Sequence, residues 1–294
     1  MFAPVALLTS IRCLIAVAVV RRWPLYQMDV KNVFLNGDLH EEVYLQPPPG
    51  YPHSGSQVCH LRHALYGLKQ APRAWFEKFS SIVAQQDFTS SPHETTLFIR
   101  RFSTGITLIL LYIDDMIITG DDSTGIRSLQ HFLSQHFEMK DLGTLSYFLG
   151  FEVTSSSDGY YLSQAKYASD LLSKAGITNN KTIFTPLEYN AKLTPLDGEP
   201  ISGATRYRQL VGSLIYLTVT RLDISHAMGM VNKFMDAPCF VHYAAVFRIL
   251  RYVKCTLYSL HYSSRSSLKL HAYSNADWAS DPTDRCFITG FYFL

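Results

Sequence analysis

Hydrophobic and polar residues follow one another along this chain in runs that predict strands and helices in a regular order. The clearest pattern has two apolar runs, Ile106 to Tyr112 and Met116 to Thr119, which flank the acidic pair Asp114 and Asp115. Runs of this length and β-branched content are typical of buried strands. We therefore predict a hairpin with two adjacent carboxylates at its tip.

The segments before residue 145 alternate between strand-like and helix-like patterns. Apolar residues three and four positions apart predict two helices, the first of which tolerates Pro72 in its first turn. The order strand, helix, strand, strand, helix, strand predicts an α+β fold in which two helices cover one face of an antiparallel sheet and leave the other face open, the split βαβ arrangement. The strands are expected at Tyr26–Val30, Val43–Gln46, Thr96–Arg101 and Ile106–Thr119, and the helices around Trp75–Val83 and Ile126–Leu133.

Helical patterns dominate the second half of the chain. A hairpin is expected first, from Leu145–Val153 and Tyr160–Ser163, and two strand-like runs end the sequence at Leu268–Ser274 and Phe287–Leu294. The Pro- and Gly-rich span Pro186–Gly203 predicts a flexible connection. We expect three parts, residues 1–163, 164–255 and 256–294. The helices are expected at Gln164–Gly176, Tyr207–Thr220, Asp223–Met235 and His242–Lys254.

Composition narrows the class of protein. With 294 residues, 47% hydrophobic and 17% charged, the chain is long enough for one large or several small domains and is not a disordered tail. A net charge of +2 neither supports nor excludes nucleic-acid binding. The cysteines are odd in number and isolated, which argues against disulfides or a zinc site and fits a reducing compartment. They are Cys13, Cys59, Cys239, Cys255 and Cys286.

A membrane anchor has to be weighed for Phe2 to Val20, because Leu14 to Val20 is an unbroken apolar run. Seven apolar residues are too few to span a bilayer, Arg12 sits in the middle of the segment, and no basic region lies ahead of the run. The spacing of the apolar positions from Leu8 to Ala18 is helical. A buried helix is the preferred interpretation, with no membrane partner and no secretion.

The acidic pair carries the candidate chemistry. Two adjacent carboxylates at the end of an apolar hairpin are costly to desolvate unless a cation binds them, and a pair of divalent ions suits phosphoryl or nucleotidyl transfer. The bland alternative is an Asp-Asp pair in a surface loop. Two further segments add specificity, Gln27-Met28-Asp29-Val30 with its single acid and Leu65 to Trp75 at the start of a helix.

With these segments in place, the chain resembles the reverse transcriptases of copia-type (Ty1/copia) long-terminal-repeat retrotransposons. The resemblance implies a palm in residues 1–163, on whose open face a duplex would lie, thumb-like helices in 164–255, and the start of a ribonuclease H domain in 256–294. It rests on seven ordered blocks, Phe2–Ala6, Gln27–Gly50, Leu65–Trp75, Tyr112–Asp115, Met139–Val153, Tyr207–Asp223 and Tyr273–Trp278.

The resemblance implies RNA-directed DNA polymerisation by two Mg²⁺ or Mn²⁺ ions held by carboxylates. The primer supplies the nucleophile, so no Ser, Cys or His nucleophile is needed. Asp29 and Asp114 are expected to bridge the ions, Asp115 to support them, and the Val30 carbonyl to complete one coordination shell. The implied partners are an RNA or DNA template with its primer and deoxynucleoside triphosphates. The implied location is the cytoplasm, with a virus-like particle or the nucleus as alternatives.

Further roles follow from matching the family motifs. Phe34 is expected to pack beneath the nucleotide sugar and exclude a 2′-hydroxyl, although alone it reads as a core residue. Lys69 has the alternative of a solvated lysine at a helix start. The residues matched to the nucleotide and template are Phe34, Tyr66, Gly67, Lys69, Gln70 and Tyr112, and those matched to the primer are Phe148, Leu149 and Gly150. Arg248, Arg251 and Lys254 recur every three residues, as a solvated stripe or a phosphate contact.

Departures from the family pattern lead to a competing hypothesis. The chain begins where the family has already supplied basic fingers strands, and loss of two phosphate contacts of ~1.5–3 kcal/mol each weakens nucleotide binding. Asn275 stands where the family's ribonuclease H has its first metal-binding aspartate, with Asp277 nearby, so we expect no ribonuclease H activity. Leu222, Cys255 and Cys286 also depart from the family. The alternative function is an inactive retroelement remnant that at most binds nucleic acid.

Overall fold

Residues 1–145 and 146–294 form two separate units in the computed structural model of this chain. The structure describes residues 3–103, 105–177, 183–189, 191, 193–195, 198–201, 203–256, 258–276 and 289–293. Each unit has its own hydrophobic core. Among the described residues, no helix has the length and apolar content needed to cross a membrane.

A six-stranded antiparallel sheet organises the first unit. Its strand order is β4-β5-β6-β7-β1-β8. The first strand of the chain, β1, therefore lies between β7 of the acidic β6–β7 hairpin and the edge strand β8. This order places segments that are far apart in the sequence side by side. The strands are β1 (Leu25–Val30), β4 (Thr89–Ser90), β5 (Leu97–Phe102), β6 (Gly105–Tyr112), β7 (Asp115–Gly120) and β8 (Met139–Thr144).

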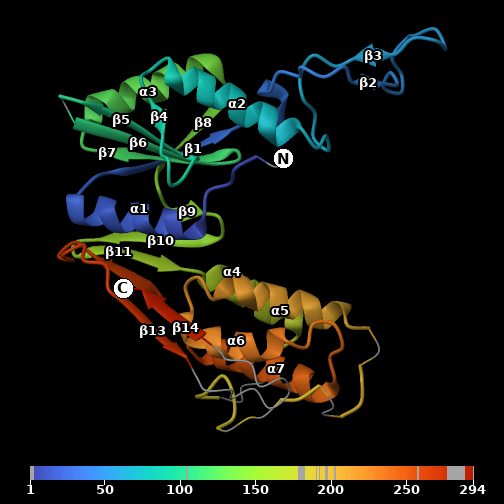
Figure 1. The fold of residues 1–294 in the computed structure, drawn as a ribbon, viewed down its shortest axis with the longest axis vertical. Helices are drawn as coiled ribbons and strands as arrows, with labels where there is room; N and C mark the ends of the chain where they lie inside the picture. The colour runs from blue at the N-terminus through green and yellow to red at the C-terminus, as the bar shows by residue number, and fades with distance from the viewer. Residues whose placement is uncertain are drawn as a thin grey trace. The chain divides into compact units, whose positions relative to one another are not determined.

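Two helices, α2 (Ala71–Ala84) and α3 (Ser123–His136), cover one face of this sheet (Figure 1). Proline stands in the first turn of α2, where it costs no hydrogen bond, and the Asp122 side chain caps α3 by accepting from the Gly125 amide at 2.9 Å. The predicted α+β class and antiparallel sheet are confirmed. The core between helices and sheet includes Met28, Trp75, Phe79, Phe98, Ile109, Leu111, Met116, Ile118 and Leu129.

The opposite face of the sheet is not open along its length. Leu25, Leu110 and Ile117, which alternate with the residues of the first core, are all 0% exposed. Helix α1 (Leu8–Arg21) lies on this side of the sheet, away from α2 and α3 (Figure 1). The prediction of a bare second face is therefore wrong for the centre of the sheet, because the apolar side chains there had to be covered.

Several short elements of the first unit were not predicted. They are the 3₁₀ helix η1 (Val33–Asn36), the strand β3 (Cys59–His60), which pairs with β2 (Tyr44–Leu45), and the two edge strands β4 and β8. Strand β8 has the sequence Met-Lys-Asp-Leu-Gly-Thr, whose polar content hides its strand character. The buried helix predicted from the spacing of Leu8 to Ala18 is confirmed by α1, which covers Leu8–Arg21.

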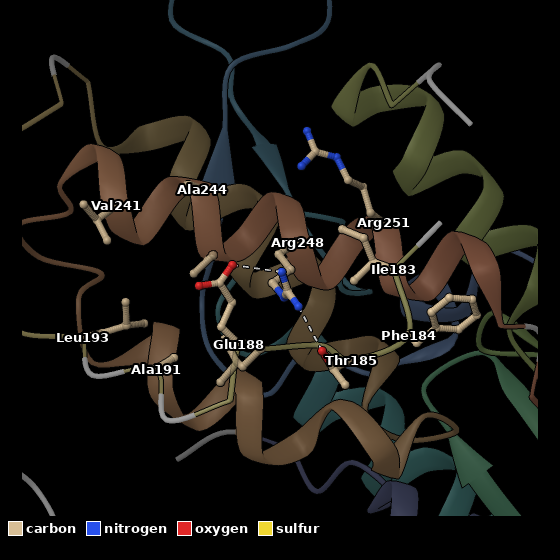
Figure 2. Close-up of a pocket in the computed structure, with 12 residues that line it drawn as sticks. Ile183, Phe184, Thr185, Glu188, Ala191, Leu193, Val241, Ala244, Arg248 and Arg251 are labelled. Carbon is tan, nitrogen blue, oxygen red and sulfur yellow. Dashed lines mark hydrogen bonds and ion pairs between the residues drawn. The ribbon is translucent and has the colours of Figure 1, made fainter. Parts of the chain in front are cut away.

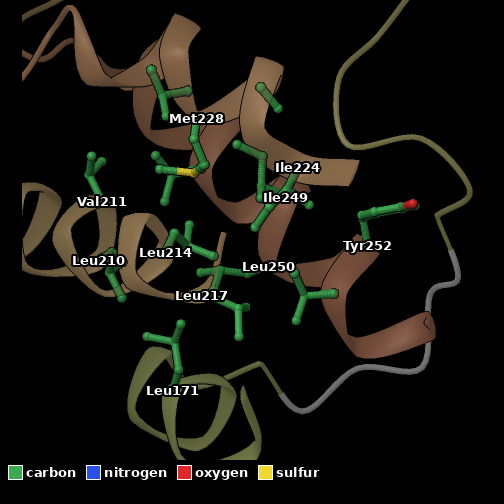
Figure 3. Close-up of a cluster of buried hydrophobic side chains, with 14 of the residues drawn as sticks. Leu171, Leu210, Val211, Leu214, Leu217, Ile224, Met228, Ile249, Leu250 and Tyr252 are labelled. Carbon is green, nitrogen blue, oxygen red and sulfur yellow. The ribbon is translucent and has the colours of Figure 1, made fainter. Parts of the chain in front are cut away.

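The second unit combines a four-stranded sheet with four helices. The strand order is β12-β11-β10-β9, with β9 (Tyr147–Phe148), β10 (Phe151–Ser156), β11 (Gly159–Ser163) and β12 (Leu260–Ser263). Four helices of this unit pack around a buried hydrophobic cluster (Figure 3). They are α4 (Ala165–Ala175), α5 (Thr205–Leu217), α6 (Ser225–Asn232) and α7 (Phe240–Cys255), and the 3₁₀ helix η2 (Leu222–Ile224) precedes α6. The four predicted helices are confirmed.

The last strands form a two-stranded antiparallel ribbon of β13 (Ala272–Ala276) and β14 (Thr289–Phe293). Asn275 pairs with Gly290 in this ribbon. Asp277, Trp278 and Cys286 lie outside the described residues. The three parts expected from the sequence, and the assignment of this ribbon to a ribonuclease H domain, stay predictions.

Candidate active site

The acidic residues of two distant sequence segments meet at one end of the six-stranded sheet. Asp29 on β1 is the direct cross-strand partner of Asp115 on β7, and Asp115 also pairs with Tyr112 on β6. Directly opposed residues of an antiparallel pair have Cβ atoms ~4.5–5.5 Å apart on the same face. Asp114 belongs to the turn, and its carbonyl accepts a hydrogen bond from the Val30 amide at 3.0 Å. The fold thus brings Asp29, Val30, Asp114 and Asp115 together.

The carboxyl group of Asp115 is perturbed by its surroundings. Burial raises the pKa of the Asp115 carboxyl, and the charges of Asp114 and Asp29 raise it further. A hydrogen bond of 3.3 Å from Gln27 Nε2 to Asp115 Oδ1 opposes the shift. Half-buried acids that repel one another gain most from a cation, because the cation offsets both the burial and the repulsion.

The donor set suits a hard divalent ion, since it offers carboxylate and carbonyl oxygens only. The side chains as they stand do not form a ready metal cluster. Within the described ranges, no group of three or more His, Cys, Asp or Glu side chains is placed to hold a metal ion. The strand register nevertheless brings Asp29 and Asp115 opposite one another.

Two residues that support the hairpin were not identified from the sequence. Gln27 is 5% exposed and holds Asp115, and the Trp75 indole donates to the Ile113 carbonyl at 2.8 Å. Ile113 sits at the tip with φ of 57°, a conformation that is costly for a β-branched residue. For Gln27, the sequence did offer a signal, because a polar side chain interrupts the apolar pattern of a buried strand. No sequence signal linked Trp75 to the hairpin.

The residues matched to the nucleotide fall in two places: Tyr112 lies on β6 beside Asp115, and the others lie on η1 or just before α2. The rings of Phe34 and Tyr66 meet edge to face, with centroids 4.7 Å apart. Gly67 has φ of 92°, which favours glycine, and Lys69 is exposed. The Gln70 side chain donates to Glu41 at 3.3 Å, a contact that the sequence did not predict.

The residues matched to the primer belong to the second unit. Phe148 is buried and pairs with Phe151, so Leu149 and Gly150 form a two-residue turn. Both turn residues have positive φ, 49° and 77°, as in the type I′ turns of tight hairpins. The Leu149 carbonyl accepts a hydrogen bond from the Tyr216 hydroxyl.

Comparison with known proteins identifies the family. The profile described as reverse transcriptase (RNA-dependent DNA polymerase) matches residues 1–189. The chain belongs to this reverse transcriptase family.

Its relatives include the Pol polyproteins of copia-type transposons, as the resemblance predicted. The chain is 42% identical over 293 residues to the retrovirus-related Pol polyprotein from transposon RE1 of Arabidopsis thaliana, a match that covers 99% of the chain and 20% of that polyprotein. It is 38% identical to the polyprotein from transposon TNT 1-94 of Nicotiana tabacum, over 99% of the chain and 23% of the relative. The putative transposon Ty5-1 protein of Saccharomyces cerevisiae is 32% identical, over 85% of the chain and 82% of that protein. The chain thus spans about a fifth of the length of the Pol polyproteins from RE1 and TNT 1-94.

One residue of the basic stripe on helix α7, Arg248, forms hydrogen bonds with a neighbouring segment of the chain. Arg248 donates to Glu188 at 3.1 Å and to Thr185 at 2.9 Å (Figure 2). Arg248 and Arg251 line a cavity of about 670 Å³ between α7 and a segment that includes Ile183, Thr185 and Glu188. None of the residues matched to nucleotide, primer or metal lines this cavity, so it is separate from the acidic site.

Proposed function

We propose that this chain supplies the polymerase centre of a copia-type retroelement and extends a DNA primer along an RNA template. The observation that carries the proposal is the register that sets Asp29 opposite Asp115, next to Asp114. The family match supports the reaction class. The substrates are deoxynucleoside triphosphates and a primer–template duplex.

Two Mg²⁺ or Mn²⁺ ions, when bound, supply the Lewis acidity that activates the primer 3′-hydroxyl and offsets the charge of the leaving pyrophosphate. Asp29, Asp114 and Asp115 would supply carboxylate oxygens to these ions, and the Val30 carbonyl would add a neutral ligand. Gln27 holds one oxygen of Asp115 and so orients the carboxylate toward its partners. The primer carries the nucleophile, so the protein's task is to hold and orient charge.

The aromatic pair of Phe34 and Tyr66 forms the surface on which the nucleotide sugar rests in this proposal. Their edge-to-face contact supports a fixed position for the Phe34 ring. A ring held there excludes a 2′-hydroxyl and selects deoxynucleotides. Gly67 allows close approach of the backbone, Lys69 and Gln70 face the template and triphosphate, and Tyr112 lies beside the carboxylates.

Primer extension on an RNA template with Mg²⁺ or Mn²⁺ tests the proposal. The wild-type chain is compared with Asp114→Asn, which keeps the size of the side chain and removes its charge. Asp170→Asn is the matched control, because Asp170 is an exposed aspartate on α4 in the second unit. Extension by the wild type and the control, with loss in Asp114→Asn, supports the enzyme. Equal background in all three supports the inactive remnant.

A further inference from the structure

The turn at Leu149 and Gly150 adopts a conformation that Leu149 does not favour. Phe148 and Phe151 pair directly, which leaves two residues to reverse the chain, both with positive φ. Glycine accepts this conformation freely, whereas leucine does so only when its surroundings impose it. The tip of this hairpin therefore needs support from outside the β9–β10 pair.

Tyr216 supplies that support. Its hydroxyl donates to the Leu149 carbonyl, and its ring lies 5.8 Å from the ring of Phe151. A Cβ at Gly150 would stand 3.2 Å from the Tyr216 hydroxyl oxygen, so the tip rests directly on this side chain. The hydrogen bond and the ring contact act on opposite ends of the turn.

Tyr216 is itself held by two helices. It lies in the last turn of α5, and its ring meets the ring of Tyr167 on α4 edge to face at 5.1 Å. The Tyr167 hydroxyl donates to the Ser213 carbonyl at 3.2 Å, which joins α4 to α5. At the end of α5, the Thr220 hydroxyl donates to the side chain of the buried Gln164 at 2.7 Å. The hairpin tip is thus connected to α5, and α5 to α4.

We infer that Tyr216 is a positioning residue that holds the Leu149–Gly150 tip in the shape that meets the primer strand. The inference rests on the proposed function for the primer contact. Gly150 suits the shape of the tip but Leu149 does not, so the helical part of the unit supports the tip through the Tyr216 hydroxyl. Loss of that hydroxyl leaves the ring packing in place and frees the tip, which then has to be ordered again each time a primer binds.

Tyr216→Phe tests this inference, with Tyr167→Phe as its matched control. Both variants remove a tyrosine hydroxyl that donates to a backbone carbonyl in the same cluster, and only the first touches the tip. Amide hydrogen exchange is measured over residues 148–153. The affinity for a fluorescein-labelled DNA primer annealed to an RNA template is measured by anisotropy.

Faster exchange at the tip and about fivefold weaker duplex binding are expected in Tyr216→Phe alone, as for the loss of one hydrogen bond. Gly150→Ala, which presses on Tyr216 from the other side, is expected to have the same two effects. Unchanged exchange in Tyr216→Phe, or equal effects in Tyr167→Phe, overturns the inference. Faster exchange with unchanged duplex affinity contradicts the positioning role of Tyr216 and leaves the proposed polymerase function untouched. A wild-type chain that binds no duplex contradicts the proposed function itself.

Discussion

Single residues in this chain show how burial and neighbouring charge are balanced. Arg221 is 4% exposed, donates two hydrogen bonds to Asp223 at 2.9 and 2.7 Å, and donates to the Thr256 carbonyl at 2.7 Å. Burial alone would raise the pKa of the Asp223 carboxyl, but hydrogen bonds from Arg221 and Tyr252, together with the charge of Arg221, leave it lowered. The ion pair therefore stabilises the second unit only while Asp223 is ionised.

This pair gives a pH-dependent prediction. Because the folded-state pKa of Asp223 lies below the ordinary value of 3.8, its contribution is full above that pH and is lost as the pH falls through the folded-state value. Asp223→Asn is expected to lower the free energy of unfolding by about 2 kcal/mol at pH 7, less than for a fully buried pair, since Asp223 is 29% exposed. Urea unfolding at pH 7 and pH 3 checks it. A difference between wild type and variant that does not shrink at pH 3 contradicts it.

Phe34 gives a second prediction at this scale. If its ring excludes the 2′-hydroxyl, Phe34→Val raises incorporation of ribonucleotides relative to deoxynucleotides on the order of tenfold. Single-nucleotide extension with each substrate measures the ratio. Phe76→Val removes a similarly half-buried ring of the same unit and controls for general loosening. An unchanged ratio in Phe34→Val refutes the sugar-contact role.

What the sequence could reveal also differs from residue to residue. Asp114 and Asp115 stand out because apolar runs flank them, and Asp29 follows once the motif is aligned. Gln27 and Trp75 do not stand out, because their hydrogen bonds join residues 88 and 38 positions apart and depend on strand register and helix placement. Such partners appear only when the non-local pairing is known.

At the scale of elements, the acidic hairpin depends on how closely η1 and α2 approach. A Cβ at Gly37 would stand 2.8 Å from the Trp75 backbone nitrogen and 2.9 Å from Ala74. Gly37 has φ of −77°, so glycine is needed here for space and not for its backbone conformation. The close approach allows η1, which carries Phe34, to lie against the helix whose Trp75 holds Ile113.

Gly37→Ala is therefore expected to push η1 away from α2 and to destabilise the first unit by about 1–3 kcal/mol, as overpacking does. Polymerase activity should fall by more than the loss of folded protein explains, because both Phe34 and the hairpin support move. Thermal unfolding and primer extension, each compared with Gly55→Ala, check this. A Cβ at Gly55 would meet nothing within 4 Å. Identical behaviour of the two variants would show that the approach is unimportant.

Strong periodicity made most helices and central strands predictable, including α2, α3, α5 and α7. The edge strand β8 escaped because only its pairing with β1, not its polar composition, makes it a strand. The covered second face of the sheet escaped for a related reason. Leu110 and Ile117 lie on the opposite face of the sheet from Leu111 and Met116, so both faces are apolar. The split βαβ order alone does not predict that a further helix covers the second face.

At the scale of the whole chain, the two units bury separate clusters. Leu214, on α5, is 0% exposed within the second core, and Ile109, on β6, is 0% exposed within the first. Each unit is therefore stabilised by its own hydrophobic core. It spans about a fifth of the length of the polyproteins from RE1 and TNT 1-94.

Leu214→Ala and Ile109→Ala are expected to act on different units. Each removes a fully buried side chain at a cost of about 2–5 kcal/mol. Hydrogen exchange followed by mass spectrometry should show lost protection in residues 146–263 for the first variant and in residues 8–145 for the second. Loss of protection across both ranges in either variant would show that the units unfold as one.

The central claim is that Asp29 and the Asp114–Asp115 doublet form one divalent-cation site. Counting free Mn²⁺ by electron paramagnetic resonance in the presence of primer–template tests it most directly, because it does not depend on turnover. We expect Asp29→Asn and Asp115→Asn each to weaken Mn²⁺ binding on the order of tenfold or more, while the exposed Asp170→Asn leaves it unchanged. Equal Mn²⁺ binding by the wild type and all three variants would show that these aspartates do not form one cation site.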